Sequence, residues 1–258
     1  MDQDLKLPQR KANYKAMSHA AGAIVLGKSL KPIFEGMLPD SRIFTVPNCV
    51  DDQYLMNDTD FSRKVNGISG RPVRHVLYLS NFIRSKGYDR VLEMALLEKQ
   101  RVNRGGERRF SFDFAGAFFD EEEHSYFSHF IEKNHLENYV NYHGVVSGDE
   151  KRKLLSDCDV FVLLTRYPKE GQPISILEAL GSGMLVITTD HAGIPDIVKN
   201  GVNGYCLKAG ADTAANAYRL MMNADFRAFA MAGRRTVLEH FTQSSYISGM
   251  EKVFDSLA

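Results

Sequence analysis

The chain has 258 residues, of which 44% are hydrophobic and 25% are charged, and its 32 Lys and Arg balance 32 Asp and Glu. A zero net charge argues against nucleic acid as a partner, because nonspecific binding needs an excess of cations over a whole face. The composition is typical of soluble globular proteins, and no apolar run approaches the ~18 residues of a membrane span. The N-terminus also lacks the apolar stretch of a signal peptide. We expect a cytoplasmic protein.

The first fifty residues contain one αβ unit. Residues 23–26 and 43–46 are short apolar runs that predict strands. A helix is predicted between them, at about residues 30–37, with Ser29 as its N-cap. One such unit is too small to form a hydrophobic core alone. We therefore interpret residues 1–51 as the last αβ unit of a larger N-terminal domain.

The next segment, residues 51–74, is polar, lacks a hydrophobic period and ends in a stretch rich in Gly and Pro. These features are typical of a linker. The sequence therefore predicts a linker over residues 52–74 and a separate domain after it, over residues 75–258.

From about residue 75 onward, short apolar runs alternate with segments of helical period, which indicates βα units around a parallel sheet. Parallel strands are buried on both faces and therefore continuously apolar, as residues 160–164 (VFVLL) are. Strands are predicted at residues 75–79, 111–115, 139–143, 160–164, 185–189 and 205–207. Helices are predicted at residues 88–100, 122–134, 149–156, 174–180, 194–199, 213–223 and 226–240. The fold class is α/β, with a Rossmann-like doubly wound parallel sheet.

The most informative stretch is residues 170–180 (EGQPISILEAL), between the strands predicted at 160–164 and 185–189. Ligands of open parallel sheets bind outside the carboxyl ends of the strands, and this stretch follows such an end. Pro173 suits the start of a helix, because its missing N–H would be unpaired there anyway. The N–H groups of Ile174 and Ser175 would then be free at the positive end of the helix dipole. The sequence therefore predicts an anion site.

Two glutamates flank this anion site. Glu170 precedes the predicted helix, and Glu178 lies about one turn inside it. A diphosphate would repel both carboxylates, so each is expected to accept hydrogen bonds from hydroxyl groups instead. A sugar on one side of a diphosphate and a ribose on the other meet that requirement. The implied ligand is a nucleotide sugar.

With these residues in place, the sequence resembles the retaining glycosyltransferases of family 4 (group 1), mainly the C-terminal donor-binding domain of their two-domain GT-B fold. Glu170 and Glu178 match the two acidic positions of the E-x7-E motif of that family. The segments that agree in order are residues 46–51 (VPNCVD), 77–87 (LYLSNFIRSKG), 141–146 (NYHGVV), 192–196 (AGIPD) and 201–207 (GVNGYCL). The resemblance extends over residues 12–258.

The resemblance implies a role for each site residue. Glu170 would hold the donor sugar and Lys86 the diphosphate, and these two are the predicted catalytic residues. The predicted donor-binding residues are Glu178 on the ribose, Val146 in the nucleobase turn, Asn81, Arg84, Gly171, Gln172, Ile174 and Ser175. Asn81 stands where the family has an arginine, and Arg84 is the cation that could replace it. Pro173 stands where the family has a glycine, which removes one backbone donor.

The resemblance implies transfer of a hexosyl group, with retention, from a nucleotide-diphosphate sugar to a saccharide or lipid-linked acceptor in polysaccharide or glycolipid biosynthesis. Donors aimed at the leaving oxygen would supply the rate, and no cofactor or metal is expected. The motif Asp157-Cys158-Asp159 precedes a buried strand at the end opposite the ligand edge, so it is not interpreted as a metal site. The basic run Lys151-Arg152-Lys153 is interpreted as a solvated helix face, with contact to anionic lipid at the inner face of the membrane as the minority interpretation.

Most of a GT-B N-terminal domain is missing from the pattern. The first hypothesis is therefore the donor half of a sugar transferase that needs an N-terminal half from a separate chain, or else a fragment of such an enzyme. The alternatives are a non-catalytic module that binds nucleotide sugars, and an inactive relative whose partial αβ unit contacts a partner.

Overall fold

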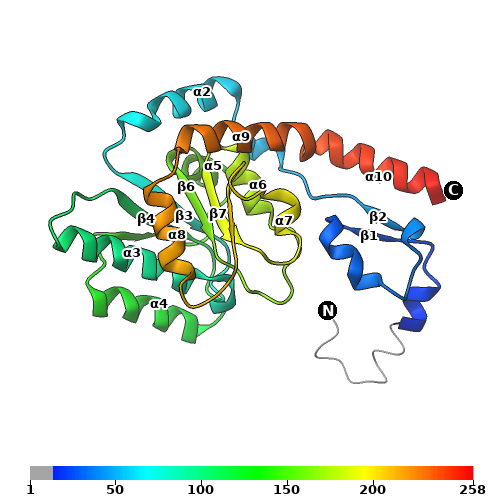
Figure 1. Cartoon of the computed structure of the whole chain (residues 1–258), viewed down its shortest axis with the longest axis horizontal. Helices are drawn as coiled ribbons and strands as arrows, with labels where there is room; N and C mark the ends of the chain where they lie inside the picture. The colour runs from blue at the N-terminus through cyan, green and yellow to red at the C-terminus, as the bar shows by residue number, and fades with distance from the viewer. Residues whose placement is uncertain (1–13, 258) are drawn as a thin grey trace.

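The computed structural model describes residues 14–257, and its centre is a six-stranded sheet in which every neighbouring pair is parallel (Figure 1). The strands lie in the order β5-β4-β3-β6-β7-β8. Their bounds are β3 Arg74–Leu79, β4 Phe110–Ala115, β5 Val140–Tyr142, β6 Val160–Leu163, β7 Leu185–Thr189 and β8 Tyr205–Leu207. The six predicted strands all form, and the α/β fold class is confirmed.

The strand order has a functional consequence. The chain starts the sheet at β3, adds β4 and β5 on one side, and then crosses to β6 on the other. In open α/β sheets, ligands bind at the point where the strand order reverses, outside the carboxyl ends of the strands. Here that point lies between β3 and β6, which pair through Val76 with Val160 and Leu77 with Phe161.

Helices cover both faces of this sheet (Figure 1). On one face lie α3 (Tyr88–Asn103), α4 (Glu121–Asn134) and α8 (Thr213–Met222). On the other lie α5 (Gly148–Asp157), α6 (Ile174–Gly181) and α9 (Phe226–His240), while the short α7 (Ile194–Ile197) follows β7. None of the helices between residues 14 and 257 has the length and apolar character needed to cross a bilayer.

The N-terminal unit is a separate, smaller body beside the sheet (Figure 1). Its strands β1 (Ala23–Val25) and β2 (Ile43–Thr45) are parallel, and its four buried core residues are Ala23, Val25, Leu38 and Ile43. The predicted helix at 30–37 is instead a 3-10 helix, η1 (Lys28–Phe34), followed by a 3-10 turn, η2 (Asp40–Arg42). Pro32 lies inside η1 and cannot supply the backbone donor that an α-helix needs.

The segment predicted as a linker contains an ordered helix, which corrects that interpretation. After the 3-10 turn η3 (Asp52–Tyr54) comes α2 (Asp58–Gly67), capped by the Asn57 side chain, and then the turn η4 (Ile68–Gly70). Phe61 and Val65 of α2 are buried in the core of the main sheet. The segment is therefore part of the large domain from about α2 onward.

A last helix, α10 (Gln243–Leu257), was not predicted by the sequence pattern. It continues from α9 and runs back beside the N-terminal unit (Figure 1). Its Gly249 lies against Val46, at the end of β2, with a built Cβ only 3.1 Å from Cγ1 of that valine. The end of the chain thus packs on the unit near its beginning.

Candidate functional site

The two predicted catalytic residues meet outside the carboxyl ends of β3 and β6. Lys86 ends the 3-10 turn η5 (Arg84–Lys86) after β3, and Glu170 lies in the loop between β6 and α6. Lys86 Nζ lies 3.5 Å from Glu170 Oε2, with 19% and 8% of the two side chains exposed. A cation and a carboxylate are therefore held together where the strand order reverses.

Other residues of the β6 loop fix Glu170. The hydroxyl of Thr165, which is fully buried, donates to Glu170 Oε2 at 3.2 Å. The ring of Tyr167 lies below Lys86, with 5.1 Å between Nζ and the ring centroid. The backbone N–H of Glu170 also donates to the carbonyl of Tyr167 at 3.0 Å. The sequence analysis did not single out Thr165 or Tyr167, because nothing in a loop sequence shows which hydroxyl or ring will reach the site.

The helix α6 begins at Ile174, four residues after Glu170. Pro173 is its N-cap, with φ −63° and ψ 120°. The first backbone bond of the turn runs from Ile176 N–H to the carbonyl of Pro173 at 3.2 Å, and the N–H groups of Ile174 and Ser175 have no acceptor among residues 14–257. Ile174 is 47% exposed, so this end of the helix faces solvent. These two amides are free to bind an anion.

Gln172, predicted to contact the donor, has a different partner for its side chain. Its Oε1 accepts from the backbone N–H of Asn48 at 2.7 Å, and its Nε2 donates to the carbonyl of Leu26 at 2.9 Å. The side-chain amide is thus used to hold the N-terminal unit. The backbone carbonyl of Gln172 also accepts from the side-chain amide of Asn48 at 2.8 Å, so its N–H is the one polar group of Gln172 without a partner among residues 14–257. Gly171 lies beside it, and its carbonyl accepts from Gly193 N–H at 2.9 Å.

Glu178 is 3% exposed and forms an ion pair that the sequence did not indicate. Lys151 Nζ of α5 donates to Glu178 Oε1 at 2.7 Å and lies 4.1 Å from the ring centroid of Tyr54. The interpretation of Lys151 as part of a solvated basic face is therefore wrong. Its neighbours Arg152 and Lys153 do form exposed pairs with Asp149 and Asp157.

The remaining predicted donor residues differ in their surroundings. Asn81 is exposed in the loop after β3, and Val146 is half-buried in the turn before α5. Arg84 turns toward α4, where its guanidinium lies 3.3 Å from Glu123 Oε2 and 4.0 Å from the ring centroid of Tyr126. The structure therefore does not place Arg84 as the replacement cation for Asn81.

A polar cluster joins β3, β4 and the residue that follows β5. Asp113 of β4 is 4% exposed, 2.7 Å from His75 Nδ1 and 2.8 Å from His143 Nε2. Its burial would raise the pKa of Asp113, but the hydrogen bonds from both imidazoles outweigh burial and lower it. The bond to Asp113 raises the pKa of His75. Within residues 14–257, no group of three or more His, Cys, Asp or Glu side chains, this cluster included, is arranged to hold a metal ion.

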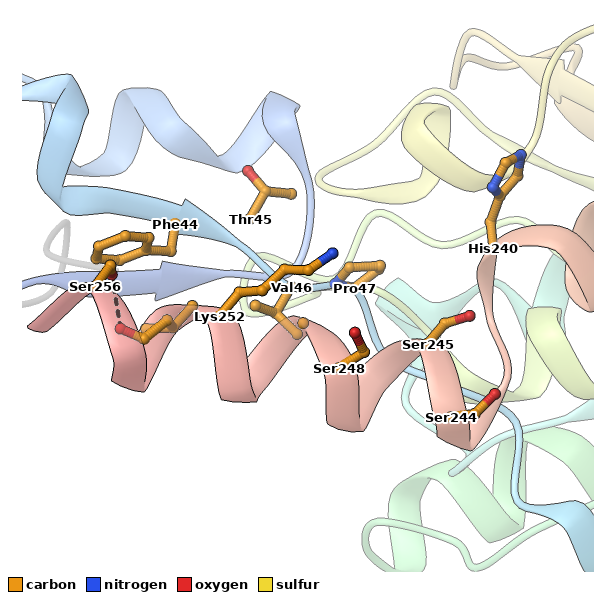
Figure 2. Close-up of a pocket in the computed structure, with 12 residues that line it drawn as sticks. Phe44, Thr45, Val46, Pro47, His240, Ser244, Ser245, Ser248, Lys252 and Ser256 are labelled. Carbon is orange, nitrogen blue, oxygen red and sulfur yellow. Dashed lines mark hydrogen bonds between the residues drawn. The ribbon is translucent and has the colours of Figure 1, made fainter.

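A cavity of about 650 Å³ lies between α10 and the end of β2. Figure 2 shows Ser245, Ser248 and Lys252 of α10 on the side facing Val46 and Pro47. None of the predicted site residues lines this cavity. It therefore belongs to the junction between the N-terminal unit and α10.

Comparison with known proteins assigns the family. Residues 58–231 match the family described as glycosyl transferases group 1. The chain belongs to this family. The match begins at α2, which agrees with the packing of that helix on the main sheet.

Two relatives illustrate how much of a longer protein this chain covers. The amylovoran biosynthesis glycosyltransferase AmsK of Erwinia amylovora is 28% identical over 130 residues, which are 48% of this chain and 32% of AmsK. The N-acetyl-alpha-D-glucosaminyl L-malate synthase of Bacillus anthracis is 26% identical over 220 residues, 84% of this chain and 54% of the relative. The chain thus spans about a third to a half of these relatives.

Solved structures share the fold. A sucrose-phosphate synthase of Thermosynechococcus elongatus superposes with a TM-score of 0.78 at 17% identity, covering 100% of this chain and 63% of that one. Anabaena HepE in complex with UDP gives a TM-score of 0.77 at 16% identity, covering 96% and 69%. The S. aureus TarM complex that contains UDP gives 0.74 at 22% identity, covering 96% and 46%. These identities support a common fold.

Proposed function

We propose that this chain binds a nucleotide-diphosphate sugar and forms the donor half of a retaining glycosyltransferase. The reaction is transfer of a hexosyl group to a saccharide or lipid-linked acceptor in polysaccharide or glycolipid biosynthesis. The observation that carries the proposal is the contact between Lys86 and Glu170, together with the free amides of Ile174 and Ser175.

The electrostatics of this site suit a diphosphate leaving group. Breaking the bond between sugar and diphosphate develops negative charge on the leaving oxygen, which preorganised donors stabilise. Lys86 and the N-terminal amides of α6 supply such donors. The proposal therefore includes no cofactor or metal. Glu170 accepts a hydrogen bond from Thr165 on Oε2, and its other oxygen, Oε1, can accept hydrogen bonds from sugar hydroxyls. We assign it this binding role and not that of a nucleophile.

The acceptor side of the cleft requires more protein than β1 and β2. A sheet of two strands is marginal by itself. The N-terminal unit is also held to the donor loops, through Gln172 and through Ser29, whose hydroxyl donates to Asp196 at 2.6 Å. The proposal therefore includes an N-terminal half, with a separate chain as one source. A lipid-linked acceptor would bring the protein to the membrane surface.

The test is a calorimetric screen of uridine, guanosine and adenosine diphosphates and their hexose conjugates. We expect one base to be preferred. Glu178→Ala should weaken binding of the plain diphosphate and of its sugar conjugate. Glu170→Ala should weaken only the conjugate. Equal affinities of both variants and the unaltered chain for every ligand would overturn the assignment.

Transfer is tested separately from binding. The preferred donor is incubated with the chain and with saccharide or lipid-linked acceptors, and the release of nucleoside diphosphate is measured. Transfer or donor hydrolysis above background supports the transferase. Tight donor binding with no release, even after an N-terminal half is supplied, would favour the non-catalytic module.

A further inference from the structure

The ion pair between Lys151 and Glu178 joins α5 to α6 at a position with little solvent exposure. Only 18% of the Lys151 side chain and 4% of the Glu178 side chain are exposed. Because both charges are largely removed from water, each depends on the other: loss of one partner leaves an uncompensated charge. This dependence distinguishes Lys151 from Lys153 on the same helix, whose side chain is 77% exposed.

The pair leaves half of the carboxylate open. Lys151 donates to Oε1, and among residues 14–257 Oε2 of Glu178 has no hydrogen-bond partner. An ionised carboxylate only accepts hydrogen bonds, so the open oxygen suits a hydroxyl donor. Lys151 holds the first oxygen and thereby fixes the direction of the second.

Tyr54 holds Lys151 in turn. The ammonium lies 4.1 Å from the centroid of the tyrosine ring, within the range of a cation–π contact. The Tyr54 hydroxyl accepts from the N–H of Gly148, the first residue of α5, at 3.2 Å. Tyr54 lies in η3, in the segment that connects the N-terminal unit to the main sheet. A line of contacts therefore runs from this segment to Glu178.

We propose that Lys151 is a positioning residue for ribose recognition and that Tyr54 couples the connecting segment to it. The ligand class is a ribonucleoside diphosphate, with a ribose hydroxyl donating to Glu178 Oε2. This inference rests on the proposed function, since Glu178 must first hold a nucleotide. It adds a determinant of ribose over deoxyribose that lies on α5, outside the motif that carries the two glutamates.

The test compares each diphosphate with its own 2′,3′-dideoxy analogue by calorimetry, with UDP and GDP as parallel probes. The unaltered chain should prefer the ribose form by about 10- to 100-fold, the size of a hydrogen bond to a charged group. Lys151→Met should bring this ratio close to one while leaving the dideoxy affinity nearly unchanged. Lys151→Arg should restore most of the preference, because a cation again faces Oε1.

Matched variants separate positioning from folding. Lys153→Met removes a lysine from the same helix and should leave the ratio unchanged. Tyr54→Leu should lower the ratio, and Tyr54→Phe, which keeps the ring, should lower it less. Should Lys151→Met not fold, Lys151→Gln carries the same test, since a neutral amide donates a bond but does not balance the charge.

The outcomes also separate this inference from the proposed function. A purely structural role predicts that Lys151→Met weakens the ribose and dideoxy forms equally, and that result would overturn the inference. So would tighter ribose binding in Lys151→Met, which would mean that Lys151 competes with the ligand for Glu178. Failure of the unaltered chain to bind any of the uridine, guanosine and adenosine diphosphates would instead overturn the proposed function.

Discussion

Lys86 and Glu170 form an ion pair outside the carboxyl ends of β3 and β6, with 3.5 Å between Nζ and Oε2. Pairing of the two strands brings their carboxyl ends, and therefore the two loops, to the same edge of the sheet. The carboxylate balances the charge of the lysine, which is only 19% exposed. A diphosphate beside Lys86 would share this cation with Glu170, while the sugar would engage the carboxylate.

Replacing Lys86 should therefore affect the diphosphate specifically. We expect Lys86→Met to weaken binding of a nucleoside diphosphate by roughly 10-fold or more, the value of one charge-assisted bond to phosphate. Binding of the nucleoside without phosphates should not change. Calorimetry with both ligands measures this, and Lys133→Met, which removes an exposed lysine of α4, is the control. Equal losses for both ligands would contradict the assignment.

Gly87 lets the β3 loop approach the end of β6. Its φ is +84°, and a built Cβ would lie 2.4 Å from the carbonyl oxygen of Leu164. Gly87→Ala should therefore lower the free energy of unfolding by about 3 kcal/mol, the strain of the left-handed conformation plus a forced shift of backbone.

Gly105 is the matched control for this variant. Its φ is +91°, but nothing lies within 4 Å of a built Cβ. Gly105→Ala should cost only the conformational strain, about 1 kcal/mol. Urea unfolding of both variants separates the two contributions. Similar losses would show that the contact with Leu164 is relieved at little cost.

The sheet could be predicted from sequence because its strands are buried on both faces. Residues 160–164 are a continuous apolar run and residues 185–189 (LVITT) combine apolar and β-branched residues, and the two segments form β6 and β7 with at most one residue of difference. In contrast, α2 was not predicted because its composition is polar. Few of its residues are apolar, and Phe61 and Val65 are the apolar residues that it buries. The helix α10 was not predicted because it is rich in serine and buries only Val253, so its apolar pattern is weak.

The site was predictable only in part, for a similar reason. Glu170 and Lys86 follow strands whose carboxyl ends must converge, so their meeting follows from topology. Lys151 lies in a run of three basic residues, and the sequence does not show that one of them turns inward to Glu178. The position of the Gln172 side chain is likewise determined by its contact with the N-terminal unit, and no local sequence pattern indicates this contact.

Lys64 gives the fold a pH dependence at alkaline pH. It is 5% exposed, and its ammonium donates to the carbonyls of Leu155 and Ser182 at 2.8 Å each. Burial penalises the charged form and lowers the pKa of Lys64 to about 8. The native chain therefore releases this proton at lower pH than the unfolded chain, in which an ordinary lysine titrates at about 10.4.

Between these two pKa values the unfolded state binds more protons, so stability should rise with pH. Relative to Lys64→Met, the unaltered chain should gain about 2 kcal/mol of unfolding free energy from pH 7 to pH 10. Urea unfolding at several pH values measures this difference, in which titrations common to both proteins cancel. Lys99→Met, which also removes bonds to two carbonyls, controls for the lost contacts. Parallel pH profiles for the unaltered chain and Lys64→Met would refute the prediction.

Asp196 of α7 holds the N-terminal unit against the large domain. Its Oδ2 accepts the backbone N–H of Ser29 at 2.9 Å and the Ser29 hydroxyl at 2.6 Å, so a residue of α7 caps the start of η1. Asp196→Ala should cost about 1 kcal/mol, as loss of a helix cap does. The substitution should lower the free energy of local opening of the N-terminal unit and not that of global unfolding. The reason is that the small core of β1 and β2 shares no buried residue with the core of the main sheet.

Amide hydrogen exchange measures where this cost appears. Exchange in residues 23–45 should become about 5-fold faster in Asp196→Ala, which corresponds to the lost cap energy, while amides of β6 should not change. Asp212→Ala is the control, because Asp212 precedes α8 without a side-chain cap bond. Faster exchange in β6 as well would mean that the N-terminal unit and the main sheet open together. Asp196 would then stabilise the whole fold, and not only the packing of the N-terminal unit on the main domain.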